Sequence, residues 1–120
     1  MAERKTARST DRFRRKREAI LDASSVIMNQ RGVKGLTLAD AAAGVGLSTT
    51  SVTYYFKRKD DLAAACMLRG IAWLQGAAEE AIAPSNPAQR LHRLLRLYFD
   101  RVGQAATGAA PPLPTLADLR

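Results

Sequence analysis

Two short helices joined by a tight turn, within residues 36–59, are the sequence feature that most constrains the fold. Ala42, Gly46 and Val52 follow the spacing A-x3-G-x5-V. This spacing supplies a small residue where two helices cross closely, a glycine for the positive φ of the turn, and an aliphatic anchor under the second helix. It predicts a helix-turn-helix over about residues 37–56.

Capping residues predict where both helices begin. Thr37 can accept a hydrogen bond from the amide of Asp40, whose carboxylate can bond back, and Ser48 can cap the second helix. Apolar residues at helical spacing then face inward, namely Leu38, Ala41, Ala42, Val45, Val52 and Phe56. The outer face of the second helix is left polar and rich in hydroxyl groups.

Longer helices are expected on both sides of the motif. The apolar spacing predicts a first packed helix from about Phe13 to Gln30 and a long helix from about Lys59 to Ala83. The sequence PSNP at residues 84–87 ends the long helix, and Asn86 and Pro87 begin a last one. That last helix carries an apolar stripe that another surface must cover, made of Leu91, Leu94, Leu95, Tyr98, Phe99 and Val102.

The segment from Arg17 to Leu62 resembles the DNA-binding domain of the TetR family of transcriptional regulators. The matching pieces are REAILDAS, RGVKGLT, LADAAAGVGLS and SVTYYFKRKDDL. The resemblance implies an all-α fold, in which a three-helix bundle containing a homeodomain-like helix-turn-helix is followed by a long connecting helix and a partial helical C-terminal domain. It also implies a sequence-specific DNA-binding transcriptional regulator, most often a repressor in that family.

The resemblance also assigns DNA-contacting positions. The expected DNA-binding residues are Thr37, Ser48, Thr49, Thr50, Ser51, Thr53, Tyr54, Tyr55, Lys57 and Lys59. Within this set, the second helix, from about Ser48 to Tyr55, reads the major groove, and Lys59 binds a phosphate. Hydroxyl groups and the methyl group of threonine suit groove edges, and a lysine near helix-terminal amides suits an anion. Two alternatives stay open: Tyr55 is also suited to the core, and Thr37 to capping alone.

The reading helix departs from the family pattern. Thr53 replaces a tyrosine that usually contacts phosphate, and Arg58 replaces a capping Ser or Asn. The helix carries no arginine, asparagine or glutamine, so bidentate recognition of guanine or adenine is scarce. We therefore expect specificity to depend partly on thymine methyl groups, water molecules and DNA shape.

Charge is concentrated in the half of the chain that would face DNA. The chain holds 19 Lys+Arg and 11 Asp+Glu, a net charge of +8. Residues 1–59 hold 13 basic and 5 acidic side chains, whereas residues 60–120 hold 6 of each. Such an excess favours counterion release from phosphates without setting sequence preference. The basic tail at residues 1–13 is expected to be disordered, and the cations at residues 14–17 either stay solvated or follow a phosphate backbone or minor groove.

Enzymatic, metal and membrane functions find no support in the sequence. Cys66 is the only cysteine and His92 the only histidine, so neither a disulfide nor a metal site is expected, and we predict no cofactor. We interpret Cys66 as a small core residue and His92 as a surface residue. Without paired carboxylates or a nucleophile with its base, no enzyme is indicated. The absence of long apolar runs and of a signal peptide favours the bacterial cytoplasm, at the nucleoid.

The predicted domains are the basic tail at residues 1–13, a DNA-binding domain at residues 14–74 and an incomplete regulatory domain at residues 75–120, which ends in a turn capped by Thr115 and Asp118. Double-stranded operator DNA is the expected partner, with a homodimer if the C-terminal domain is completed and a small-molecule effector as a further candidate. The alternative function is a small basic helical module that binds DNA non-specifically or docks a protein through its Leu-rich last helix.

Overall fold

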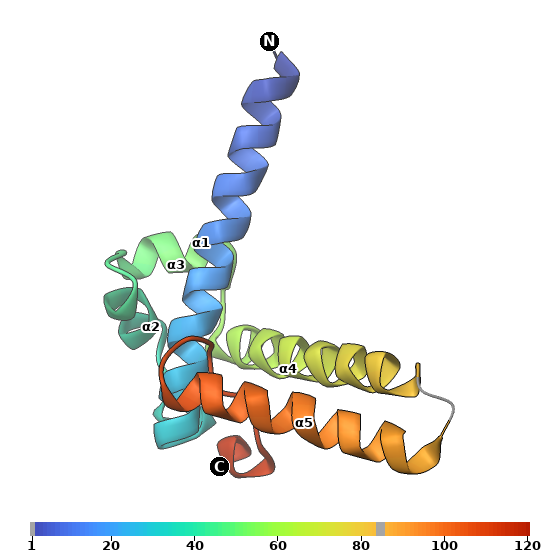
Figure 1. Cartoon of the computed structure of the whole chain (residues 1–120). Coiled ribbons are helices and arrows are strands. Elements are labelled where there is room, and N and C mark those ends of the chain that lie inside the picture. Colours follow the sequence, from blue (N-terminus) through green and yellow to red (C-terminus); the bar gives the residue numbers. More distant parts are fainter. Residues whose placement is uncertain (1, 84–85) are drawn as a thin grey trace.

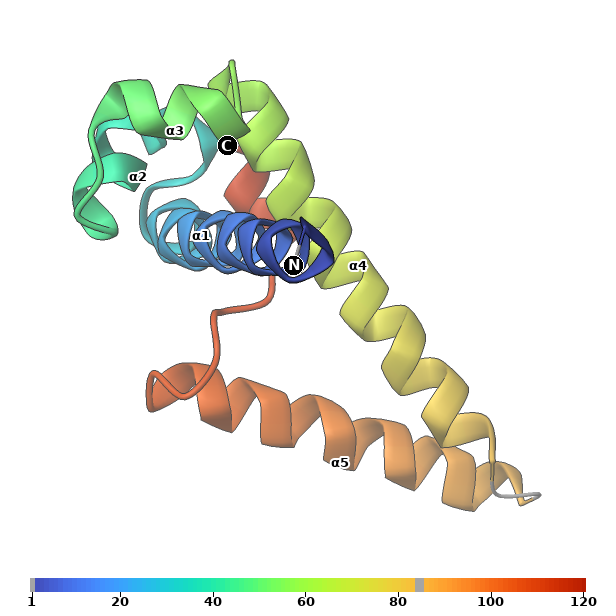
Figure 2. The ribbon, with the colours of Figure 1, turned by 90° about the horizontal axis from the view of Figure 1, so that it is seen from above.

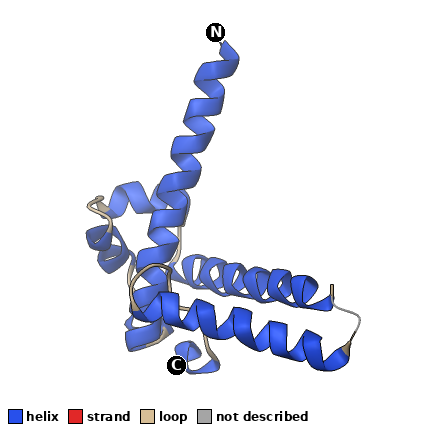
Figure 3. Ribbon diagram, in the orientation of Figure 1, coloured by secondary structure: helices blue, strands red, loops and turns tan. Residues whose placement is uncertain are grey.

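The computed structural model describes residues 2–83 and 86–120, with side chains from residue 8 onward, and within them the fold is entirely helical (Figures 1 and 3). The elements in chain order are α1 (Ala2–Arg31), the 3-10 turn η1 (Val33–Gly35), α2 (Leu38–Gly44), α3 (Thr49–Tyr55), α4 (Lys59–Ile82), α5 (Pro87–Ala106) and the 3-10 turn η2 (Leu116–Leu119). The predicted fold class is confirmed. Among these residues, no helix is long and apolar enough to cross a membrane.

The hydrophobic core lies where α1, α2, α3 and the first half of α4 meet. Its buried members are Ile20, Leu21, Met28, Leu36, Ala41, Ala42, Val52, Phe56, Leu62, Ala63 and Cys66. The alanines of α2 allow a close crossing with α1, whereas Val52 and Phe56 hold α3 from below. This core fixes the orientation of α3, and the inward positions expected for Val52 and Phe56 are confirmed.

The N-terminal region differs from the sequence prediction. Helix α1 begins at Ala2, whereas we expected a disordered tail and a first helix from about Phe13. Residues 2–17 contain no glycine or proline and are rich in arginine, lysine and alanine, which have high helix propensity. The segment therefore continues the packed part of α1 as a helix that projects beyond the rest of the domain (Figure 1).

Helices α4 and α5 form a hairpin that extends from the bundle of α1, α2 and α3. In Figure 2, viewed down α1, the helices α2 and α3 lie to one side and α4 runs outward to the start of α5. Asn86 caps α5 by accepting from the amide of Ala88, as predicted, and Pro87 is the first helical residue. Pro84 and Ser85, in the expected break, lie outside the described residues. The apolar stripe of α5 is largely exposed in this chain, since Leu91 and Phe99 remain 59% and 65% accessible.

The C-terminal segment returns from α5 to α1 and η1. Thr115 and Asp118 form the predicted capped turn, and the buried Asp118 carboxylate accepts from the amide and hydroxyl of Thr115 at 3.2 and 2.9 Å. The amide of Lys34 donates to the carbonyl of Arg120 at 3.0 Å, which joins η2 to η1. This segment crosses α4 at Gly70, where an added Cβ would lie 2.3 Å from Pro114.

Candidate DNA-binding surface

Helices α2 and α3 are positioned by the caps that the sequence predicted. The Thr37 hydroxyl accepts from the amide of Asp40 at 3.0 Å, and the Ser48 hydroxyl accepts from the amide of Ser51 at 3.1 Å. The Asp40 carboxylate lies 3.5 Å from Arg31 of α1. It does not make the expected bond back to the Thr37 amide, so Thr37 caps α2 without a capping box. Between the helices, Gly46 has φ 68°, a conformation that favours glycine. Short-range contacts thus set the helix-turn-helix geometry.

The outer face of α3 presents the polar side chains expected there. Thr49, Thr50 and Tyr54 are exposed, and Tyr54 is 77% accessible. Two other hydroxyl groups are engaged within the helix: Thr53 donates to the carbonyl of Thr50 at 2.6 Å, and the Ser51 hydroxyl lies 2.9 Å from that of Ser48. Among the predicted reading residues, Thr49, Thr50 and Tyr54 therefore have side chains most open to a ligand.

An aromatic cluster joins the C-terminal end of α3 to α1. Phe13 stacks on Tyr55 with ring centroids 4.7 Å apart and contacts the edge of Tyr54 at 6.1 Å. The two tyrosine rings lie 5.5 Å apart, and Arg17 sits over the Phe56 ring at 5.2 Å. Tyr55 is half-buried and packs against the core, which agrees with the alternative that it serves in packing. The contact of Phe13 with α3 was not predicted, although Phe13 lies seven residues before the buried Ile20 and so falls on the same side of α1.

The basic residues after α3 have separate environments. Lys57 is exposed, and Arg58 lies 3.6 Å from Asp60 across the start of α4. Lys59 is half-buried, and its ammonium group donates to the carbonyl of Val33 at 3.3 Å. Lys59 therefore connects α4 to η1, a contact between distant residues that spacing alone did not indicate.

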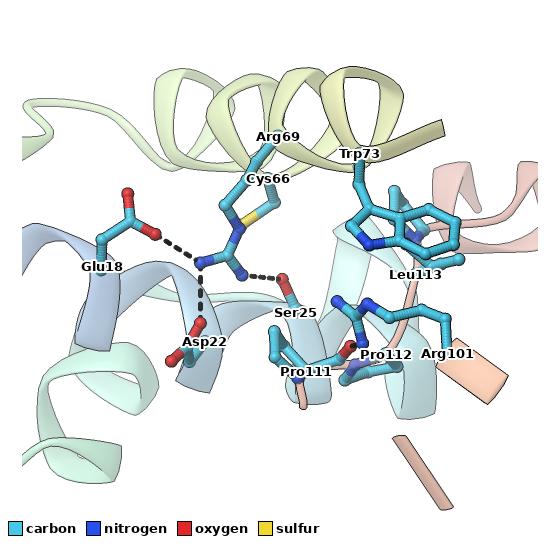
Figure 4. Close-up of a pocket in the computed structure, with 12 residues that line it drawn as sticks. Glu18, Asp22, Ser25, Cys66, Arg69, Trp73, Arg101, Pro111, Pro112 and Leu113 are labelled. Atoms are coloured by element: carbon cyan, nitrogen blue, oxygen red, sulfur yellow. Dashed lines mark hydrogen bonds and ion pairs between the residues drawn. The ribbon is translucent and has the colours of Figure 1, made fainter. Parts of the chain in front are cut away.

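A polar cluster connects α1 with α4 (Figure 4). The Arg69 guanidinium donates to Glu18 at 2.9 Å, to Asp22 at 2.7 Å and to Ser25 at 3.3 Å. Burial lowers the pKa of Arg69, but the hydrogen bonds to both carboxylates raise it by more, so the net pKa shift is upward. The two acidic residues stand four apart on α1, a spacing that places both carboxylates on one face of the helix and could have indicated a shared cation.

A cavity of about 290 Å³ opens beside this polar cluster. Trp73, Arg101 and the prolines at 111, 112 and 114 line its other side, and the Arg101 guanidinium lies 5.6 Å from the centre of the Trp73 ring. Burial and the nearby Arg69 lower the pKa of Arg101. Cys66 lies at the cavity wall, where burial raises the pKa of its thiol. The expected core position of Cys66 and surface position of His92 are confirmed.

The described part of the chain offers no metal-binding site. No group of three or more His, Cys, Asp or Glu side chains there could hold an ion. The surface instead combines the exposed hydroxyl groups of α3, the buried side chains that anchor this helix, and nearby cations. These features suit the binding of a polyanion whose own surface is grooved.

Comparisons with known proteins agree with this geometry. The family model described as "Bacterial regulatory proteins, tetR family" matches residues 20–66. The HTH-type transcriptional regulator BetI of Paraburkholderia phymatum is 33% identical over 88 residues, which cover 71% of this chain and 44% of the relative. Proteins of the same name from Burkholderia thailandensis and Serratia proteamaculans are 34% and 31% identical over 88 residues, again 71% of this chain and 45% and 44% of the relatives.

The chain thus spans less than half the length of these relatives. No solved structure matches it.

Proposed function

Because residues 20–66 place the chain in the TetR family of bacterial regulatory proteins, we propose that it regulates transcription by placing α3 in the major groove of a double-stranded operator. The observation that carries this proposal is the exposed face of α3, whose opposite face is anchored by the fully buried Val52. A short helix with one face fixed in the core presents its other face in a defined orientation. Such preorganisation is what base readout requires.

Base contacts are assigned to the three exposed reading residues. Thr49 and Thr50 offer a hydroxyl group and a methyl group each, which suit base edges and the thymine methyl. Tyr54 offers a phenolic hydroxyl on a ring already oriented by Phe13 and Tyr55. Since hydroxyl and methyl groups make few bidentate contacts with bases, specificity depends also on ordered water and on groove shape.

Phosphate contacts are assigned to residues at the edges of the motif. Lys57 is exposed directly after α3, and Thr37 and Ser48 lie at the N-termini of α2 and α3, where backbone amides favour anions. Ser51, Thr53 and Tyr55 belong to the same surface but have partners within the domain. Lys59 can bind phosphate only if its ammonium shares or leaves the carbonyl of Val33.

Several finer features follow from family membership as part of this proposal. We assign the DNA-binding unit to residues 14–74 and regulation to the remainder of the chain. A homodimer would place two reading helices on two half-sites, and a repressor controlled by a small-molecule effector is the mode most often met in the family. The proposed location is the bacterial cytoplasm at the nucleoid.

A DNA-binding titration tests the proposal. The 120-residue chain is titrated against a labelled duplex from the region upstream of its own gene and against a shuffled duplex, at low and physiological salt. We expect preference for the native duplex to persist at the higher salt, because base contacts do not depend on counterion release. Equal binding that disappears with salt would overturn specific regulation.

Point variants separate the two kinds of contact. Thr50→Val keeps the methyl group and removes the hydroxyl, whereas Thr50→Ser does the reverse, so the pair identifies which group reads a base. Loss of the group that reads the base should reduce discrimination at that base pair by less than the about 1–3 kcal/mol of a bidentate contact. Lys57→Ala is the control, since it should weaken binding to both duplexes alike.

The alternative function rests on one observation, the exposed apolar stripe of α5. A module that binds DNA non-specifically, or that docks a protein partner through this stripe, would show no preference between the two duplexes. The same titration therefore distinguishes the two functions.

A further inference from the structure

The N-terminal half of α1 is a charged helix beside the reading surface. Residues 8–17 hold six cations and one acidic residue, Asp11. Figure 1 shows α1 continuing well past α3, and Figure 2 shows α3 lying crosswise beside it. At 1.5 Å per residue, the helix from Ala2 to Phe13 extends about 16 Å beyond the aromatic cluster. A duplex lying on the outer face of α3 would therefore meet this segment.

The cations of this segment form a row on one side of the helix. Arg8, Arg12 and Lys16 recur every four residues and are exposed, so their side chains lie next to one another. Among the described side chains, Arg14 pairs with Asp11 at 3.0 Å and Arg17 with Glu18 at 3.8 Å, but no carboxylate pairs with Arg12 or Lys16. The row is therefore an uncompensated line of positive charge.

Such a row is unfavourable for an isolated helix. Like charges four residues apart on a helix repel each other. A polyanion placed along the row removes this penalty. DNA phosphates provide this charge at one per roughly 1.7 Å of duplex axis.

Contacts with α3 fix where the row lies. Phe13 belongs to the same segment as Arg12 and Lys16 and stacks on Tyr55 while touching Tyr54, so α1 and the reading helix form one rigid unit. The Arg17 guanidinium over Phe56 adds a second contact one turn further along α1. Seating α3 in a groove would consequently determine the position of the charged row.

We propose that residues 8–17 of α1 form a second DNA-binding element, which binds backbone phosphates beside the groove entered by α3, and that Phe13 is the positioning residue for it. This inference rests on the proposed function, since α3 places the duplex. It adds a partner surface outside the helix-turn-helix and outside residues 20–66. The element contributes affinity and salt dependence, whereas base preference stays with α3.

The salt dependence of binding tests the row. The full chain binds a fluorescein-labelled shuffled duplex of about 40 base pairs, read by anisotropy between 50 and 200 mM NaCl. The double variant Arg12→Ala with Lys16→Ala should make the negative slope of log K against log salt shallower by about 1.8, because each lost phosphate contact removes about 0.9 from its magnitude. The control Arg93→Ala with Arg96→Ala removes two charges from α5 and should leave the slope within about 0.3 of the parent. Equal slopes for the two double variants would overturn the proposal.

The positioning role of Phe13 has its own test. Phe13→Ala keeps every cation but removes the ring that contacts α3, so the negative slope should become shallower as in the double variant, while Phe13→Tyr should restore it. Phe13 is 41% accessible, and thermal unfolding followed by circular dichroism checks that the fold persists. A parent slope for Phe13→Ala would refute the positioning role.

Failure of this proposal differs from failure of the proposed function. Loss of the slope difference refutes the charged row even when the native duplex is preferred. Equal affinity for native and shuffled duplexes refutes specific readout even when the slope difference is present.

Discussion

Replacing Arg69 with methionine should weaken the junction between α1 and α4. The guanidinium donates to Glu18, Asp22 and Ser25 at 2.9, 2.7 and 3.3 Å, whereas methionine keeps most of the stem that packs on α4. In Arg69→Met the two carboxylates stand four residues apart on α1 without a shared cation and repel each other. We therefore expect a less stable chain rather than an unfolded one.

Exposure sets the magnitude of this effect. The Arg69 side chain is 26% accessible, but Glu18 and Asp22 are 46% and 53% accessible and regain water when the cation is lost. Half-exposed ion pairs contribute about 0.2–1 kcal/mol each. Two such pairs and the lost bond to Ser25 together give an expected decrease of about 1–2 kcal/mol in the free energy of unfolding.

Urea unfolding followed by circular dichroism measures this loss. A double-mutant cycle of Arg69→Met with Asp22→Asn should give a coupling energy of about 0.5–1 kcal/mol at 50 mM salt. Salt at 1 M reduces the Debye length to about 3 Å, so the coupling should decrease there. Arg96→Met, which removes an exposed cation from α5, is the matched control and should have little effect.

Two results would refute the reasoning. A coupling energy of zero at 50 mM salt would mean that Arg69 and Asp22 do not interact in solution. A coupling that does not change at 1 M salt would mean that packing, and not charge, connects α1 to α4.

Two further predictions follow from single buried or capping groups. Ser48→Ala removes the hydroxyl that accepts from the amide of Ser51, so the free energy of unfolding should decrease by about 1 kcal/mol in urea titrations; Ser48→Gly should cost only a few tenths, and equal losses would contradict a capping role. Burial raises the pKa of the Cys66 thiol above its ordinary value of 9.0, so the thiol should react with a disulfide reagent at pH 8 far more slowly in the folded chain than in urea. Because folding favours the protonated thiol, stability should be unaffected by this group below pH 9 and decrease as pH rises above it.

Local chemistry made much of the fold predictable. The caps at Thr37, Ser48 and Asn86 act over two or three residues, and the glycine turn at Gly46 depends on one dihedral angle. The N-terminal helix is equally local, but its density of charge predicts disorder, whereas the helix propensity of arginine and lysine favours the helix that the structure contains. The exposed positions on α3 followed from the periodicity that buries Val52.

Contacts between distant residues could not be predicted in the same way. Arg69 meets Asp22 across 47 residues, Lys59 meets Val33 across 26, and Phe13 reaches the two tyrosines of α3. Each of these depends on the angle at which two helices pack, which no single stretch of sequence encodes.

The sequence by itself therefore determined the helices, their caps and the polar face of α3, because these depend on neighbours within one or two turns. Only the tertiary structure decided that the basic half of α1 stands beside α3, that Arg69 joins α1 to α4, and that the segment after α5 returns to η1. Those arrangements arise when the shared core fixes helix positions, since that packing brings together side chains that are far apart in the chain.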